Sequence, residues 1–190
     1  MDQQLAHTSG RKLIEEPGHE KDWATPPKFC EVLYQFDSVV LDPCSNEHSV
    51  LRSKERWTLD KKYTSNGKVV SKSPDDTFTT PWPLNGLVYC NPPYGKESDP
   101  FLKKMVEESK RGVEIIALVP ARVDAIRWHK WAEQADIVLF WKGRISFINP
   151  ATGKPQAGTK FPSAVLYWGS RADRFLQVFG PLGSARVRPA

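Results

Sequence analysis

The sequence predicts an α/β fold with a mostly parallel sheet and helices on both faces. Three short apolar runs, at 38–41, 87–90 and 115–119, have the composition of buried parallel strands. Helical patterns are expected between them, as in strand–helix–strand units. Such units bring the ends of successive parallel strands to one edge of the sheet.

Each of the three predicted strands is followed by residues whose polar groups could take part in binding or catalysis. The first leads into Asp42-Pro43-Cys44, the second into Asn91-Pro92-Pro93-Tyr94 and the third into Pro120-Ala121-Arg122. Ligands of open α/β sheets bind beyond the carboxyl ends of the strands. These three segments are therefore the first candidates for a functional site.

The clearest predicted helix follows the second strand. Asp99 suits its N-cap, Pro100 its first turn and Gly112 the position just beyond its end. One face of this helix is apolar and is expected to pack on the sheet through Phe101, Leu102, Met105 and Val106.

A second helix is predicted over 124–135, with Ile126, His129 and Trp131 facing inward. Beyond it, strands are expected at 137–141, 145–148 and 164–168. The residues between the last two strands, 149–160, are rich in Gly, Pro and Lys and predict an exposed hairpin loop.

The segment 52–83 is more polar. Its residues 56–59 suit a strand, and Asn66-Gly67 is typical of a tight hairpin turn. The expected organisation is a polar N-terminal tail over 1–21, one domain over 22–180 and a C-terminal tail over 181–190.

Composition narrows the functional classes. The net charge of +5 over 190 residues favours a polyanionic partner. No apolar stretch approaches the length of a membrane span, and no signal-peptide core is present, so a cytoplasmic location without membrane contact is expected. Three widely spaced cysteines predict neither a disulfide framework nor a metal site, and Cys44 and Cys90 suit small core positions. The sequence leaves the oligomeric state open.

The segment Asn91-Pro92-Pro93-Tyr94 suits chemistry on an exocyclic amine of a nucleobase. That amine is a poor nucleophile because its lone pair is delocalised into the ring. Hydrogen-bond acceptance at the Asn91 side-chain oxygen and the Pro92 carbonyl would favour a pyramidal, reactive nitrogen. The prolines fix the direction of that carbonyl, and Tyr94 offers a face for an extruded base. The Asn91 NH₂ could donate to a ring nitrogen or to a cofactor; the alternative interpretation is a rigid surface turn with a packed tyrosine.

Five motifs in this order resemble the small phage-type DNA N6-adenine methyltransferases, over about 22–169 of the chain. They are Trp23-Ala24-Thr25-Pro26, Leu41-Asp42-Pro43-Cys44-Ser45, the Asn-Pro-Pro-Tyr segment, Pro120-Ala121-Arg122-Val123-Asp124 and Gly143-Arg144-Ile145-Ser146-Phe147. The resemblance implies a Rossmann-like, seven-stranded doubly wound fold and S-adenosylmethionine as methyl donor. It also implies transfer to a flipped adenine of double-stranded DNA.

The resemblance also implies roles for particular residues. The cofactor would lie against residues near the N-terminus, after the first strand and in the polar segment: Trp23, Thr25, Pro26, Asp42, Pro43, Cys44, Asp60, Asp76, Phe78 and Asn91. The glycine-rich turn common to methyltransferases is absent after Asp42, a feature that the resembled family shares.

Basic residues near the later strand ends are candidates for DNA contact. They are Arg122, Lys142, Arg144, Lys154 and Lys160. The length leaves no room for a separate recognition domain, so sequence specificity is either low or supplied by the hairpin loop.

Two alternatives remain at this point. The same segment suits methylation of cytosine N4 or of RNA, because each uses an exocyclic amine. A catalytically silent DNA-binding module with the same fold is the other alternative, and S-adenosylmethionine binding would distinguish it.

Overall fold

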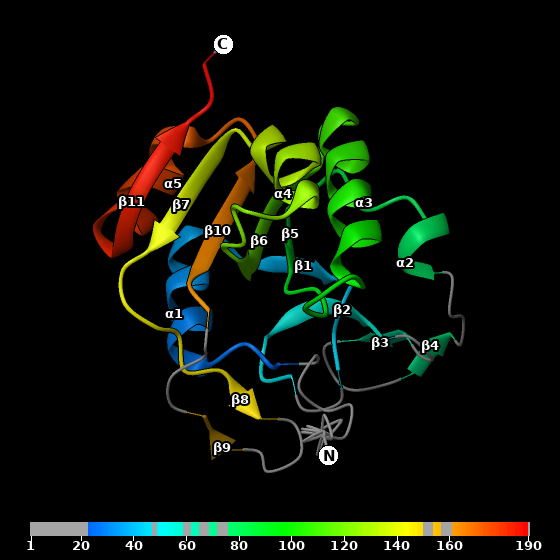
Figure 1. Cartoon of the computed structure of the whole chain (residues 1–190). Helices are drawn as coiled ribbons and strands as arrows, with labels where there is room; N and C mark the ends of the chain where they lie inside the picture. The colour runs from blue at the N-terminus through cyan, green and yellow to red at the C-terminus, as the bar shows by residue number, and fades with distance from the viewer. Residues whose placement is uncertain are drawn as a thin grey trace, which may run out of the picture.

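The computed structural model describes 23–46, 49–58, 62–64, 69–71, 76–149, 154–156 and 161–189, with side chains for all of these except 62–64, 69–71 and 76. These residues form a mixed α/β structure in which one large sheet lies between two layers of helices (Figure 1). A separate two-stranded ribbon lies beyond one end of the sheet.

The large sheet of the described residues has nine strands in the order β11-β7-β10-β6-β5-β1-β2-β3-β4. The four neighbours β6, β5, β1 and β2 pair in parallel, and every other neighbouring pair is antiparallel. Six strands therefore run in one direction, against β3, β10 and β11. The expected count of seven is exceeded because the β3–β4 hairpin and the C-terminal β11 extend the two sides, whereas the strand expected at 145–148 is not part of this sheet.

The strands are β1 (Val39–Asp42), β2 (Ser53–Trp57), β3 (Lys62–Thr64), β4 (Val69–Ser71), β5 (Leu87–Cys90), β6 (Glu114–Pro120), β7 (Ile137–Trp141), β8 (Ile148–Asn149), β9 (Lys154–Pro155), β10 (Ser163–Trp168) and β11 (Gly183–Val187). The helices are α1 (Pro27–Phe36), α2 (Asp76–Thr79), α3 (Ser98–Lys110), α4 (Ile126–Lys130) and α5 (Ala172–Phe179), with single 3-10 turns η1 (Ala132–Gln134) and η2 (Gly180–Leu182).

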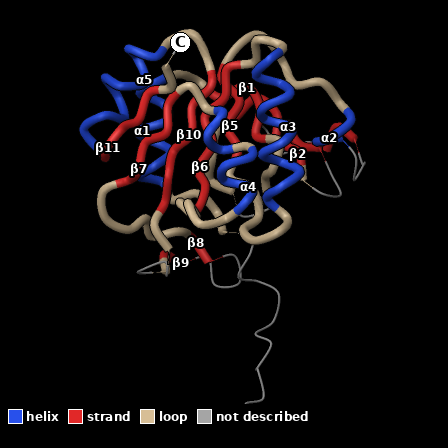
Figure 2. The backbone as a smooth tube through the Cα atoms, turned by 45° about the horizontal axis from the view of Figure 1, so that its top comes forward, coloured by secondary structure: helices blue, strands red, loops and turns tan. Residues whose placement is uncertain are grey.

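The two faces of the sheet carry separate apolar cores (Figure 2). Helices α3 and α4 cover one face, and α1 and α5 cover the other. The central strands β5 and β6 are buried on both faces, as the near-continuous apolar runs of their sequences predict. The prediction of parallel central strands with helices on both faces is confirmed.

Helix α3 confirms most of its sequence prediction. Phe101, Leu102, Met105 and Val106 are buried, and Gly112 lies just past the end with a φ of +93°. The helix begins two residues earlier than expected, at Ser98 after Glu97 as the N-cap, without a side-chain cap. Asp99 instead lies in the first turn, where its carboxylate accepts a hydrogen bond of 2.9 Å from the indole of Trp131.

The helix expected over 124–135 is shorter, because α4 ends at Lys130 and the 3-10 turn η1 follows. Two of its predicted inward residues are wrong. Ile126 is 85% exposed and the His129 side chain is 60% exposed, whereas Trp128 is buried. Helix α4 also begins later than expected, at Ile126, and Trp128 is the side chain that it buries.

Three further segments differ from their predictions. Residues 144–147 are not a strand, and only Ile148–Asn149 pairs, in the small ribbon with β9. The expected C-terminal tail contains β11, which pairs with β7. Strands β1 and β5 are separated by β2, β3, β4 and the four-residue α2, and the described residues between them contain no long crossover helix. The strand expected at 56–59 is present as β2, and the predicted turn around Asn66-Gly67 lies outside the described residues, between β3 and β4.

A buried ion pair fixes α3 against the segment before β5. The Lys104 ammonium lies 2.6 Å from the Glu108 carboxylate, and both side chains are almost fully buried. Glu108 also accepts a hydrogen bond from the backbone N–H of Trp82, at 3.3 Å, and pairs with Arg111. One carboxylate thereby satisfies a buried cation and a buried backbone donor.

Substitution Glu108→Ala should lower the free energy of unfolding by about 3–5 kcal/mol, because it leaves the Lys104 charge buried without a partner. Glu107→Ala is the matched control, since Glu107 lies 3.6 Å from Lys103 with both side chains more than half exposed. This control should cost less than about 1 kcal/mol. Urea unfolding followed by circular dichroism measures both, and equal losses would contradict the role of the buried pair.

Candidate active site

The candidate site lies at the carboxyl edge of β1, β5 and β6. These strands are parallel neighbours, so the residues that end or follow them, Asp42, Asn91 and Pro120, meet at one edge. The segment before α1 reaches the same edge, because the side chain of Asn91 binds it directly. The predicted meeting of these three strand ends is confirmed.

The Asn91 carboxamide joins two segments of the chain. Its Nδ2 donates to the carbonyl of Trp23 at 2.7 Å and to Oγ1 of Thr25 at 3.3 Å. A carbonyl only accepts, so the atom facing Trp23 must be the NH₂ group and Oδ1 faces the other way. The NH₂ group, for which the sequence suggested a ring nitrogen or a cofactor as acceptor, thus has two acceptors within the chain, and its donation to a ligand stays a prediction.

Tyr94 holds the other end of the Asn91 amide. Its hydroxyl donates to Asn91 Oδ1 at 3.1 Å. The ring is 7% exposed and meets Phe147 and Phe161 edge to face, at centroid distances of 5.7 and 5.0 Å. Burial raises the pKa of Tyr94 well above its usual range, so the hydroxyl keeps its proton and remains a donor. Stacking of a base on Tyr94 stays a prediction.

A small hollow opens beside this amide. Five of the predicted cofactor residues line it together: Trp23, Thr25, Asp42, Cys44 and Asn91. Sequence reasoning missed three other polar residues of its wall, Ser45, Asn46 and Ser49, which follow the recognised Asp-Pro-Cys motif directly.

Asp42 is the charged group of the hollow. Only 4% of the residue is exposed, and burial raises the pKa of its carboxyl to about 6. One carboxylate oxygen accepts the backbone N–H of Cys44 at 3.2 Å. A buried carboxylate with a raised pKa is stabilised by any cationic group that binds beside it.

The remaining predicted cofactor residues in described segments do not line this hollow. Pro26 precedes α1 and its carbonyl accepts from the first turn, while Pro43 is buried after β1. Asp60 lies outside the described residues, and Asp76 begins α2. Phe78 packs against Phe101 at 4.8 Å and is 36% exposed.

Thr77 brings α2 to the site. Its hydroxyl donates to the carbonyl of Pro43 at 2.6 Å, so α2 lies against the turn after β1. Thr77 was not among the predicted site residues, although Asp76 and Phe78 on its two sides were.

Of the two prolines that follow Asn91, Pro92 is buried and Pro93 is half-buried. Cys90 is fully buried, as expected of a core residue.

Arg122 lies on the same edge of the sheet as Asn91. It is exposed, and Asp124 holds its guanidinium through two contacts of 3.2 Å. Arg122 lines a second hollow with Arg127 and with Gly95, the residue that follows Tyr94. Arg127 was missed, although it lies on the predicted helix close to Arg122.

Three other predicted DNA-contacting residues lie in described segments of the chain and are exposed. Lys142 and Arg144 are exposed in the segment after β7, and Lys154 is exposed on β9. Lys160 lies outside the described residues. The predicted hairpin loop is present as the β8–β9 ribbon, in which Asn149 Nδ2 donates to Gln156 Oε1 at 2.9 Å.

Two connections join the ribbon to Asn91. Ala24 and Ile148 exchange backbone hydrogen bonds of 3.1 and 3.0 Å, which tie the ribbon to the residues that Asn91 binds. Phe147, directly before β8, packs on Tyr94. A displacement of the ribbon would therefore reach both ends of the Asn91 amide.

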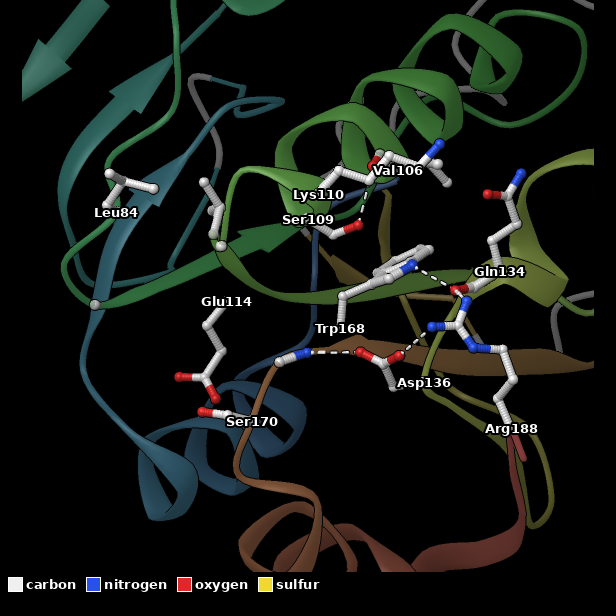
Figure 3. A pocket seen from close by; sticks show the side chains of 14 residues that line it. Leu84, Val106, Ser109, Lys110, Glu114, Gln134, Asp136, Trp168, Ser170 and Arg188 are labelled. Atoms are coloured by element: carbon white, nitrogen blue, oxygen red, sulfur yellow. Dashed lines mark hydrogen bonds and ion pairs between the residues drawn. The ribbon is translucent and has the colours of Figure 1, made fainter. Parts of the chain in front are cut away.

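A larger hollow, of about 550 Å³, lies at the opposite edge of the sheet (Figure 3). Its carboxylates are paired within the protein: Asp136 lies 2.6 Å from Arg188, and Glu114 pairs with Arg171. The Trp168 indole donates to the Gln134 carbonyl at 3.0 Å. These contacts fix the last strand to the sheet and leave the site at the carboxyl edge as the candidate for chemistry.

Within the described part of the chain, no group of three metal-ligating side chains comes together. Its helices are also too short or too polar to cross a membrane.

The chain was compared with protein families, curated proteins and solved structures. The family model described as DNA N-6-adenine-methyltransferase (Dam) matches residues 15–178. No curated protein and no solved structure matches.

The buried Asp42 carboxyl predicts a specific pH dependence of stability. Its pKa is raised from 3.8 to about 6, so the folded state binds a proton that the unfolded state has lost between these values. The free energy of unfolding contributed by Asp42 should therefore fall as pH rises through this window. Asp42→Asn removes this pH dependence. The free energy of unfolding of the variant relative to wild type should therefore rise by on the order of 3 kcal/mol from pH 4 to pH 7. Parallel stability–pH curves from denaturant unfolding would contradict the assignment.

Proposed function

Because the chain belongs to the DNA N-6-adenine-methyltransferase (Dam) family, we propose that it transfers a methyl group from S-adenosylmethionine to the N6 amine of adenine in double-stranded DNA. The observation that carries this proposal is the Asn91 carboxamide, held at both ends directly beside a hollow with a buried carboxylate. An amine and a methyl donor would meet at that point.

The residues of the hollow suit S-adenosylmethionine. This cofactor is cationic at its sulfonium and at its amino group, and the Asp42 carboxylate is buried with a raised pKa that such a cation relieves. Trp23, Thr25 and Pro26 would flank the methionine end, and Asp42 and Cys44 would border it from the turn after β1. Asp60, Asp76 and Phe78 are proposed for the ribose and the adenine of the cofactor. When bound, the cofactor supplies the methyl group.

The Asn91 oxygen is the proposed acceptor for the substrate amine. A carboxamide oxygen has two lone pairs, and Tyr94 uses one of them. The second can accept an N6 hydrogen, while the Pro92 carbonyl accepts the other. Both acceptors draw the nitrogen toward a pyramidal geometry, and their fixed positions require little reorganisation in the transition state.

The substrate base must leave the duplex to reach Asn91 and Pro92. The proposed phosphate contacts are Arg122, Lys142, Arg144, Lys154 and Lys160. Sequence preference is proposed to come from the β8–β9 ribbon, because it carries exposed polar side chains and is tied to the catalytic segment.

Nucleoside analysis tests the proposed reaction. Purified protein is incubated with unmethylated DNA or RNA and labelled S-adenosylmethionine, and the digested nucleosides are separated by mass spectrometry. The proposal predicts label in N6-methyladenine from DNA. Label in N4-methylcytosine or in RNA, or binding of DNA without any transfer, would contradict it.

Asn91→Ala should lower kcat by at least ~100-fold, because it removes an acceptor that matters chiefly in the transition state. The dissociation constant of S-adenosylmethionine should change by less than ~3-fold. Single-turnover rates and calorimetry measure the two quantities, with thermal unfolding as the control for folding. A variant that retains more than about a tenth of the rate would refute the role of Asn91.

Lys142→Ala combined with Arg144→Ala should flatten the slope of log affinity against log salt by up to ~2 units, at ~0.9 for each lost phosphate contact. Lys103→Ala with Lys110→Ala on α3 is the matched control, because it removes the same charge from another surface. DNA affinity is measured across a salt series for both variants. Equal slopes for the two double variants would remove Lys142 and Arg144 from the DNA surface.

A further inference from the structure

The loop between β6 and α4, together with the first residue of α4, presents apolar side chains to solvent. Ile126 is 85% exposed, the highest exposed fraction among the large apolar side chains that stand out on the described surface, and Val123 is 50% exposed. The Ile126 side chain therefore contributes little to the apolar core. Its removal should leave the stability of the free protein nearly unchanged.

Basic side chains flank this apolar pair. Arg122 and Arg127 stand on either side of it in the sequence, and both line a hollow with Gly95 of the catalytic segment. The loop therefore combines exposed aliphatic groups with cations beside the point where a base would enter the site. That combination matches a DNA duplex, whose phosphates attract the arginines and whose stacked bases accept an apolar group.

The base of the loop is firmly held. The N–H of Ala125 donates to the Arg122 carbonyl at 3.0 Å, and Trp128 N–H donates to the Ala125 carbonyl at 2.9 Å. The Trp128 ring is buried and stacks on Phe140 at a centroid distance of 6.0 Å. Ile126 thus projects from a fixed support, so little of its binding energy is lost to ordering the loop.

We propose that Ile126 is the wedge that enters the duplex and occupies the space left by the extruded adenine. The inference rests on the proposed function and deepens it by assigning the step that opens the substrate. Unstacking and unpairing a base costs a few kcal/mol, and an inserted aliphatic side chain offsets part of that cost. Arg127 and Arg122 then hold the phosphates on the two sides of the gap, with a phosphate replacing Asp124 as the partner of the exposed Arg122 guanidinium.

The test compares a paired and an unpaired target. A duplex is built around a methylated site mapped in plasmid DNA, with the target adenine opposite thymine or opposite an abasic position. Wild type, Ile126→Ala and the control Leu84→Ala are assayed in single turnovers on both duplexes. Leu84 is a suitable control because it is 54% exposed and lines the hollow at the opposite edge of the sheet.

Ile126→Ala should lose at least ~10-fold in rate on the paired duplex and less than ~2-fold on the abasic one, since no partner strand then holds the adenine. Leu84→Ala should match wild type on both. Equal losses of Ile126→Ala on the two duplexes, or no loss on either, would overturn the wedge. Failure of the proposed function itself is distinguishable, because wild type would then methylate neither duplex.

Discussion

The Asn91 carboxamide is the contact on which the rest of the site depends. Its NH₂ group binds the Trp23 carbonyl, and its oxygen accepts the Tyr94 hydroxyl, so two segments far apart in sequence are fixed around one side chain. The NH₂ group of a carboxamide donates hydrogen bonds and its oxygen accepts them. The carbonyl of Trp23 can only accept, so it permits one orientation of the Asn91 amide. The oxygen is therefore aimed before any substrate arrives.

The sheet and the ribbon make this arrangement rigid. Parallel pairing of β1, β5 and β6 brings Asp42 and Asn91 to one edge, at the ends of strands buried on both faces. The ribbon is joined to the site through the bridge between Ala24 and Ile148 and the packing of Phe147 on Tyr94. The surface proposed to contact DNA is thus connected to the atom proposed to accept the amine.

Local patterns in the sequence sufficed for β1, β5, β6 and the helix after β5, because apolar periodicity and a helix-ending glycine are local signals. They also predicted that Asp42 and Asn91 would share an edge. The partners of Asn91 were not predictable, since one of them lies 68 residues away and is a backbone carbonyl without a side-chain signature. The exposure of Ile126 was missed because the helix begins at this residue and buries Trp128 instead, and β11 was missed because its side chains are mostly exposed.

A structure of the protein with S-adenosylhomocysteine and a duplex containing a methylation site tests the central claim most directly. The account predicts an extruded adenine whose N6 amine donates to Asn91 Oδ1, while Asn91 Nδ2 still donates to the carbonyl of Trp23. An Asn91 amide turned away from the base, or an adenine bound elsewhere, would contradict it.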